Sequence, residues 1–278
     1  MPEYGMFIDV SKCTGCYSCF LACKDEYCGN DYPGYSASQP STGHYWMRLV
    51  EKERGTYPKV KLDYVPTPCM QCREASCIKS SKNGSVYRRS DGIVIIDPEK
   101  AKGQKEIVSS CPYRVIYWNE EKGVPQKCTF CAHLLDEGWK EPRCVETCPT
   151  GALVFGDMND PESGLSKLRS SQDVEILHPE YELNPGVCYV GLPKRFIAGE
   201  VILGNQPDEC AEGISVTLVS ETGMQNGKTD HYGDFEFEGL ESNKDFVVKI
   251  EHEGYSPREF SVKTRTDINL GEILLESV

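Results

Sequence analysis

The chain has 278 residues, of which 39% are hydrophobic and 26% charged, a composition that excludes collagen-like and disordered proteins. It contains no apolar run of about 18 residues, and its first residues lack a signal-peptide pattern, so we expect a cytoplasmic protein without a membrane span. Residues 1–195 carry 24 basic and 26 acidic side chains, whereas residues 196–278 carry 6 and 17. This break predicts two domains, and the acidic second one is unsuited to bind nucleic acid or anionic lipid.

Cysteine is the unusual residue of this chain. There are fifteen, and thirteen precede residue 150. An odd number of cysteines without a secretory signal favours metal ligation in a reducing compartment over a disulfide framework.

The first motif along the chain has the C-x2-C-x2-C-x3-C spacing of bacterial ferredoxins. Its members are Cys13, Cys16, Cys19 and Cys23. In such a motif three thiolates bind one iron-sulfur cube and the fourth binds a second cube, which a partner run holds. Structural zinc also uses C-x2-C pairs, but two pairs per site would leave Cys19 without a role, so we favour iron-sulfur clusters.

A second group of cysteines is incomplete. Cys69, Cys72 and Cys77 follow one another as C-x2-C-x4-C, and Cys111 precedes a proline as the last member of a run would. Under the same exchange of fourth ligands these four thiols form one site. Because this half is degenerate, a three-iron cluster or a zinc ion is an alternative there.

Four positions at which a further cysteine would complete this second group hold other residues instead. They are Ser81, Ala101, Gln104 and Ile107. All four would have ligated the same cluster, so the loss of one cluster explains every gap, and these side chains cannot replace thiolates on iron.

The last cysteine group has the spacing C-x2-C-x12-C-x3-C and is followed by Pro149. It is the partner of the first motif. Exchange of fourth ligands predicts one cluster on Cys13, Cys16, Cys19 and Cys148 and another on Cys23, Cys128, Cys131 and Cys144. With Cys69, Cys72, Cys77 and Cys111, the sequence predicts three [4Fe–4S] clusters on twelve cysteines.

Other residues near these motifs receive weaker predictions. Basic side chains beside the ligands could raise cluster potentials, although a solvated or subunit-facing charge is at least as common: Lys12, Lys24, Arg73, Arg114 and Lys127. We expect a surface or interface role for His133 and buried, non-ligating roles for Cys28, Cys188 and Cys210. Tyr113, Tyr117 and Trp118 are expected to pack against a cluster.

Residues 156–195 show no clear period and are expected to wrap the first domain. Beyond them, period-two alternation around residues 214–218, 235–237 and 246–250 predicts strands with one buried face. Turn signals between them complete the pattern of an acidic seven-strand β-sandwich over residues 196–278. The acidic residues at 230–238 lack the spacing of a calcium loop, and we expect a solvated acidic face.

The four cysteine groups in this order resemble the iron-sulfur subunits of the dimethyl sulfoxide reductase family of molybdenum or tungsten enzymes, over residues 1–155. The resemblance implies an α+β domain of two pseudo-symmetric bacterial ferredoxin-like halves over residues 1–195. It also implies an electron-transfer role beside a large catalytic subunit that holds bis-molybdopterin guanine dinucleotide. The family normally carries four clusters, so this chain departs from it in one.

The tail resembles transthyretin-like or carboxypeptidase-regulatory-like sandwiches through Gly199-Glu200-Val201, residues 229–237 and Gly254-Tyr255. A three-cluster module fused to such a sandwich narrows the resemblance to small subunits of transhydroxylases that act on polyhydroxybenzenes, paired with their large subunit as a heterodimer.

We find no catalytic triad, and thiolate-ligated iron leaves no open site, so we expect catalysis to belong to the partner. Three alternatives are open: the electron-transfer subunit of a polysulfide, thiosulfate, nitrate or dimethyl sulfoxide reductase, a structural protein stapled by clusters, and a free-standing ferredoxin.

Overall fold

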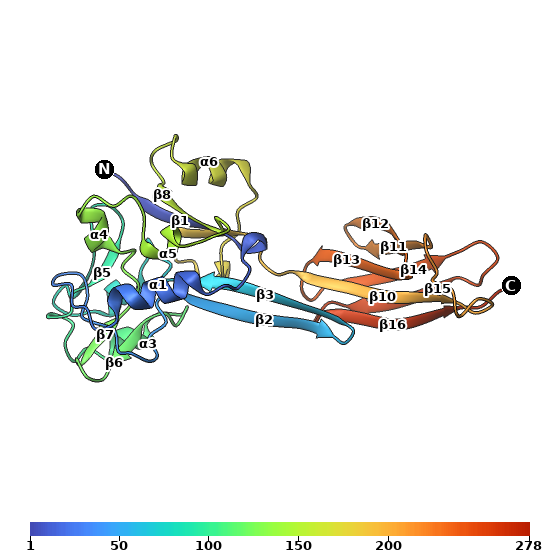
Figure 1. Cartoon of the computed structure of the whole chain (residues 1–278), viewed down its shortest axis with the longest axis horizontal. Helices are drawn as coiled ribbons and strands as arrows, with labels where there is room; N and C mark the ends of the chain where they lie inside the picture. The colour runs from blue at the N-terminus through green and yellow to red at the C-terminus, as the bar shows by residue number, and fades with distance from the viewer. The chain divides into compact units, whose positions relative to one another are not determined.

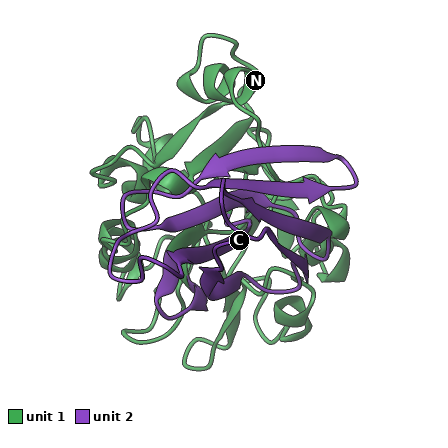
Figure 2. Cartoon of the chain, turned by 90° about the vertical axis from the view of Figure 1, so that its right-hand side faces the viewer, with its two compact units in different colours: residues 1–51, 63–192 green, residues 52–62, 193–278 purple.

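The computed structural model describes residues 1–278, which form two compact units with separate hydrophobic cores (Figures 1 and 2). Unit 1 comprises residues 1–51 and 63–192, and unit 2 comprises residues 52–62 and 193–278. The hairpin of β2 (Arg48–Thr56) and β3 (Lys59–Thr67) contributes its tip to unit 2 and its base to unit 1. Nothing in the sequence indicates this assignment of residues 52–62.

Unit 1 is built around a three-stranded sheet. Its central strand β1 (Tyr4–Asp9) pairs antiparallel with β8 (Leu153–Asp157) and parallel with β9 (Val187–Val190). Helix α6 (Gly164–Ser171) packs on β1 and β8. The segment expected only to wrap the domain therefore supplies a helix and a sheet strand, because the short apolar run at residues 187–190 is buried in parallel pairing.

The helices that follow the cysteine motifs are short and lie in pairs. Helix α1 (Ser18–Tyr27) packs against α5 (Arg143–Glu146), and α2 (Ser76–Ser80) packs against α3 (Glu106–Ser109). Helices of this length are marginal without tertiary support. The remaining elements of unit 1 are η1 (Val10–Lys12), β4 (Val86–Arg88), β5 (Val94–Ile96), β6 (Tyr117–Asn119), β7 (Val124–Gln126), α4 (Ala132–Asp136) and η2 (Pro179–Tyr181).

Unit 2 contains a mixed sheet with strand order β13-β10-β16, in which β10 and β16 are parallel, and an antiparallel sheet with strand order β12-β11-β14-β15. Apolar side chains from both sheets form one hydrophobic core. The strands predicted from alternating residues are present as β11, β13 and β14, whose inward residues, such as Val216, Phe235 and Val248, are buried. The seven strands are β10 (Arg195–Leu203), β11 (Ser215–Ser220), β12 (Gly223–Lys228), β13 (Asp234–Leu240), β14 (Asp245–Glu251), β15 (Arg258–Lys263) and β16 (Ile268–Leu275).

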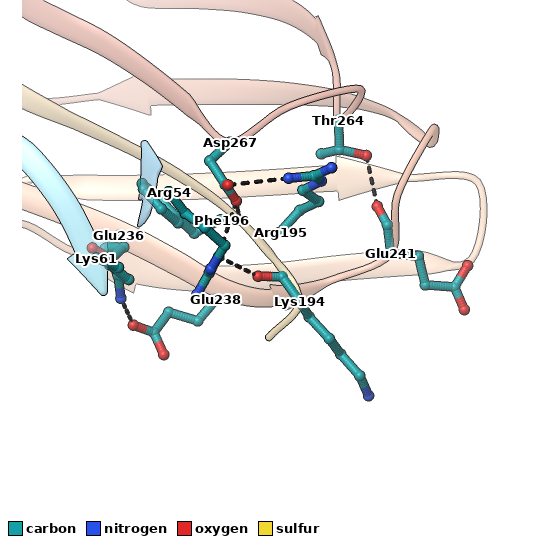
Figure 3. A network of polar contacts seen from close by, with 10 residues as sticks. All are labelled: Arg54, Lys61, Lys194, Arg195, Phe196, Glu236, Glu238, Glu241, Thr264 and Asp267. Carbon is teal, nitrogen blue, oxygen red and sulfur yellow. Dashed lines mark hydrogen bonds and ion pairs between the residues drawn. The ribbon is translucent and has the colours of Figure 1, made fainter. Parts of the chain in front are cut away.

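A polar network joins the hairpin tip to the strands of unit 2 (Figure 3). Asp267 is 3% exposed at its side chain and accepts from Arg54 Nη1 at 3.1 Å, Arg195 Nη1 at 3.1 Å and the Phe196 N–H at 3.1 Å. Lys61 pairs with Glu236 and Glu238, while its ammonium lies 5.2 Å from the Phe196 ring centre.

The acidic residues of β13 are therefore not simply the solvated face that their spacing suggests. Asp234 pairs with Lys59, and the two glutamates share Lys61. Sequence reasoning missed this because the lysines lie far away in the chain, on residues 52–62.

Candidate iron-sulfur centres

The first predicted ligand set lies in a tight turn between η1 and α1. Gly15 has φ +66°, and Tyr17, which precedes α1, has φ +62°. These two left-handed residues fold the chain back on itself, so that Cys13, Cys16 and Cys19 face a common centre. Burial, with smaller contributions from Cys13 and Cys148, raises the pKa of Cys19 to about 12.

Cys148 joins this first set from the end of α5. The pKa of Cys13 is raised by burial and then by Cys148 and Cys16. Cys16 is exposed, and its pKa is lowered by hydrogen bonding to Ser18. Cys19 is thus close enough to Cys13, Cys16 and Cys148 for electrostatic interaction, and a common cluster on these four thiols stays a prediction.

The second set is fully buried. The pKa of Cys23, on α1, is raised well above its usual value by burial, then by Cys128 and Cys131. The pKa of Cys144, on α5, is raised by burial and then by Cys131, Cys128 and Cys23. Because α1 packs against α5, Cys23 lies near Cys144, although about 120 residues separate the two in the chain.

The third set lines one cavity. Cys69, Cys72, Cys77 and Cys111 surround it together with apolar side chains such as Val94, Val115 and Ile116. The pKa of Cys72 is raised by burial and then by Cys69, Cys111 and Cys77. Cys111 reaches the cavity from just beyond α3, because α3 packs against α2, which carries Cys77.

The three sets lie in the order one, two, three. Cys19 of the first set acts electrostatically on Cys23 and Cys144 of the second. Cys69 of the third set acts on Cys128 of the second. The second set therefore lies between the other two, an order that the motifs alone do not indicate.

The donor chemistry of these sets fits iron-sulfur clusters. All fifteen cysteines are free thiols. Thiols that are crowded and buried resist ionisation unless a cation balances them, and a bound metal deprotonates a coordinating thiol outright. No group of three or more His, Cys, Asp or Glu side chains is placed so as to hold a single metal ion. The ligation of clusters by the twelve cysteines stays a prediction.

The four positions without a thiol lie in a region that side chains fill, and the apolar cluster there packs against Cys72, Cys77 and Cys111 of the third set. Ala101 and Ile107 are completely buried in an apolar cluster with Val86 and Ile96. The Gln104 side chain is 8% exposed, and its carbonyl oxygen accepts from the Lys82 N–H at 2.8 Å and from Ser85 Oγ at 3.1 Å. Its amide nitrogen donates to the Lys100 carbonyl at 2.7 Å. Side chains thus fill this region, and both polar atoms of the Gln104 side chain have hydrogen-bond partners.

Of the basic residues that precede or follow ligands, one is buried. Lys127 is 2% exposed. Lys24 donates to Gln39 Oε1 and to the carbonyls of Pro40 and Gly43, while Lys12 and Arg73 pair with Asp9 and Glu3.

The expectation of a surface or interface role for His133 is wrong. This side chain is 3% exposed, its Nε2 lies 2.9 Å from Glu26 Oε1, and its ring stacks on Tyr32 with centroids 3.7 Å apart. Sequence reasoning missed it because its partners come from α1 and from the loop after α1, far from His133 in the chain.

The three spare cysteines differ from one another. Cys188 is buried in β9 as expected, Cys28 is half-buried, and Cys210 is exposed, which contradicts the prediction for it. Among the aromatic residues, Tyr113 lines the cavity of the third set and donates to the Leu177 carbonyl at 3.2 Å.

Two residues that contact the segments carrying the predicted ligands gave no signal in the sequence. Gln71 is 2% exposed, and its amide donates to the Cys128 carbonyl at 3.1 Å and accepts from the Val94 N–H at 2.8 Å. Tyr64 covers Gly15 so closely that a Cβ there would lie 2.6 Å from its ring. Both are recognisable only from tertiary packing.

None of the helices combines the length and the apolarity that crossing a bilayer requires.

Comparisons with known proteins identify iron-sulfur relatives of this chain. A family model described as a 4Fe-4S dicluster domain matches residues 60–158. The chain is 42% identical over 282 residues to the pyrogallol hydroxytransferase small subunit of Pelobacter acidigallici, which covers 99% of this chain and 100% of the relative. It is 30% identical over 234 residues to the arsenate respiratory reductase iron-sulfur subunit of Shewanella sp. strain ANA-3, covering 67% and 95%. It is 35% identical over 159 residues to a subunit of the anaerobic dimethyl sulfoxide reductase of Escherichia coli, covering 57% and 75%.

Proposed function

Because this chain belongs to the iron-sulfur, electron-transfer subunits of the dimethyl sulfoxide reductase family of molybdenum enzymes, we propose that it carries three [4Fe–4S] clusters. Cluster one uses Cys13, Cys16, Cys19 and Cys148, cluster two uses Cys23, Cys128, Cys131 and Cys144, and cluster three uses Cys69, Cys72, Cys77 and Cys111. The observation that carries the proposal is the meeting of each set's thiols from distant parts of the chain. When bound, such clusters each carry one electron at a time.

We propose further that the partner is a large molybdopterin subunit with a molybdenum-loaded bis-molybdopterin guanine dinucleotide, in a cytoplasmic heterodimer. The full-length similarity to a pyrogallol hydroxytransferase small subunit supports pyrogallol-to-phloroglucinol transhydroxylation as the reaction of the complex. The chain itself supplies electron transfer, since its thiolate sites leave no position open for substrate.

Within this proposal the chain has two domains. Residues 1–195, including a wrapping segment at 156–195, form two ferredoxin-like halves, an interpretation supported by the paired helices α1–α5 and α2–α3. Residues 196–278 form the transthyretin-like or carboxypeptidase-regulatory-like sandwich, an interpretation supported by the two sheets around one core.

The test is anaerobic purification of the native complex, with iron, sulfide, molybdenum and tungsten measured per copy of this chain. About twelve irons, expected for three four-iron clusters, together with one Mo or W per large partner support the proposal. Iron well below that, or zinc in its place, contradicts it. Conversion of pyrogallol by the same preparation then tests the reaction.

An electron-transfer role in an oxyanion or dimethyl sulfoxide reductase is the second candidate, favoured by the similarity to the reductase subunits of Shewanella and Escherichia coli. A complex that reduces such an acceptor with an electron donor, and leaves pyrogallol unchanged, would select it over transhydroxylation.

A further inference from the structure

A buried lysine lies among the predicted cluster ligands without a carboxylate partner. Lys127 is 2% exposed, and its ammonium donates to the carbonyls of Val94 and Cys128, the latter at 3.1 Å. Both acceptors are uncharged. Burial of an ammonium among uncharged acceptors costs several kcal/mol unless a negative charge lies nearby.

Thiols of two different predicted sets lie near Lys127, and each becomes negatively charged when it binds a metal centre. The lysine lines the cavity of the third set, together with Cys77. Burial raises the pKa of Cys77 to about 11, and the Lys127 charge acts against this as the strongest opposing influence. The same charge also acts to lower the pKa of Cys128 of the second set, as the last of five influences on that thiol. Lys127 thus lines the cavity of the third set and donates to the backbone carbonyl of Cys128 in the second set.

The lysine is also held in place. Gln71, itself 2% exposed, bonds to the Cys128 carbonyl and to the Val94 N–H, so it ties together the two residues whose carbonyls the ammonium contacts. The backbone around Lys127 is therefore fixed by a neutral side chain. Removal of the lysine charge leaves this link intact.

We propose that Lys127 is a positioning residue that supplies a fixed positive charge to clusters three and two and so favours their reduced states. A [4Fe–4S] cluster with four thiolates gains one further negative charge on reduction, and a nearby buried cation stabilises that charge in a medium of low dielectric constant. One electron enters from the reductant, and no bond or proton is exchanged. This inference rests on the proposed function, since it requires the clusters.

The test is an EPR-monitored redox titration of the holo complex carrying Lys127→Met or Lys127→Gln. We expect the equilibrium constant for reduction of cluster three to fall at least about tenfold, which corresponds to about 59 mV for a one-electron couple. Cluster two should shift less, and cluster one should keep its potential. Lys127→Arg, which keeps the charge, should retain most of the wild-type potential of cluster three. Lys122→Met, which removes a partly exposed lysine that pairs with Asp31, is the matched control and should change none of the three.

Unchanged potentials in both neutral variants, or equal shifts of all three clusters, would overturn the proposal. If neither neutral variant folds, wild-type complex labelled with ¹⁵N-lysine provides the second test. Pulsed EPR should detect nitrogen coupling to reduced cluster three, and its absence overturns the proposal as well. Failure of the proposed function is distinguishable, because wild-type complex would then lack about twelve irons and three reducible clusters.

Discussion

Gly15 shows how a single residue sets the geometry of the first ligand turn. Its φ of +66° is a conformation that residues with a side chain adopt at a cost, and Tyr64 leaves no room for a Cβ. The turn between Cys13 and Cys16 therefore depends on glycine for two separate reasons.

We predict that Gly15→Ala displaces the first turn and costs cluster one. The measurement is iron per purified chain, which should fall from about twelve to about eight, with loss of one EPR signal. Gly34→Ala is the matched control, since Gly34 also has positive φ, +83°, but nothing lies within 4 Å of its would-be Cβ. Similar iron loss in both variants would show that backbone strain alone, and not the Tyr64 contact, is responsible.

Ligand exchange between distant runs makes a second prediction at the residue scale. Cys148→Ser and Cys13→Ser should abolish the same EPR signal, whereas Cys144→Ser and Cys23→Ser should abolish another, because the thiols meet in these combinations. Cys210→Ser changes an exposed thiol and should leave all signals intact. Suppose instead that Cys148→Ser and Cys144→Ser abolish the same EPR signal and that Cys13→Ser retains this signal. That result would contradict the exchange of fourth ligands.

At the scale of elements, an ion pair fastens the β4–β5 turn to the end of α4. Arg89 donates to both oxygens of Asp136, at 2.8 and 2.6 Å, and to Asp91, while Tyr35 donates to Asp136 at 2.5 Å. Hydrogen bonding by Arg89 is the main reason that the pKa of Asp136 lies below its usual value.

This pair predicts a particular pH dependence. The pKa of Asp136 is lower in the folded state than in the unfolded state. The stabilisation of the folded state by this ion pair is therefore fully present above the unfolded-state pKa of about 3.9, and it is lost only as the pH falls through the folded-state pKa. Asp136→Asn should therefore shorten the half-life of the cluster absorbance by a similar factor, about 1.5 to 5, at pH 5 and at pH 8. Glu121→Gln, on an exposed turn, should have no effect. If Asp136→Asn shortened the half-life at pH 8 but not at pH 5, that result would contradict the lowered pKa of Asp136.

Sequence patterns predicted those elements whose signals are local. The cysteine spacings indicated the four motif turns, and alternation around Val216, Phe235 and Val248 indicated three strands. The burial of His133 and Lys127 could not be predicted, because their surroundings are assembled from segments far apart in the chain. Strand β9 was missed because a short apolar run has no period that separates it from a loop.

At the scale of the whole molecule, residues 52–62 are attached to the remainder of unit 2 through a buried ion-pair network. We predict that Asp267→Asn, which leaves Arg54 and Arg195 beside a neutral side chain, destabilises this attachment by about 3 kcal/mol. Trypsin should then cleave the hairpin after Arg54, Lys59 or Lys61 at least several-fold faster, as mass spectrometry of timed digests would show. Asp208→Asn, in an exposed loop of the same unit, is the control. Equal cleavage rates would mean that the ion pairs do not hold the hairpin.

The separate cores of the two units predict different responses to metal removal. The core of unit 1 includes predicted cluster ligands, whereas the core of unit 2 contains no cysteine. Chelation of iron should therefore abolish hydrogen-exchange protection in unit 1 and leave that of β11 and β14 nearly unchanged. Joint loss of protection in both units would contradict independent cores.

The packed region around Gln104 has a consequence for the history of the chain. A back-mutation to cysteine at this one position would discard hydrogen bonds to three residues and gain a lone thiol that no metal could use. Ala101 and Ile107 would each have to change as well, inside a core that tolerates little added volume. We therefore expect each single replacement by cysteine here to lower the free energy of unfolding, so that a fourth metal centre would require several destabilising substitutions at once.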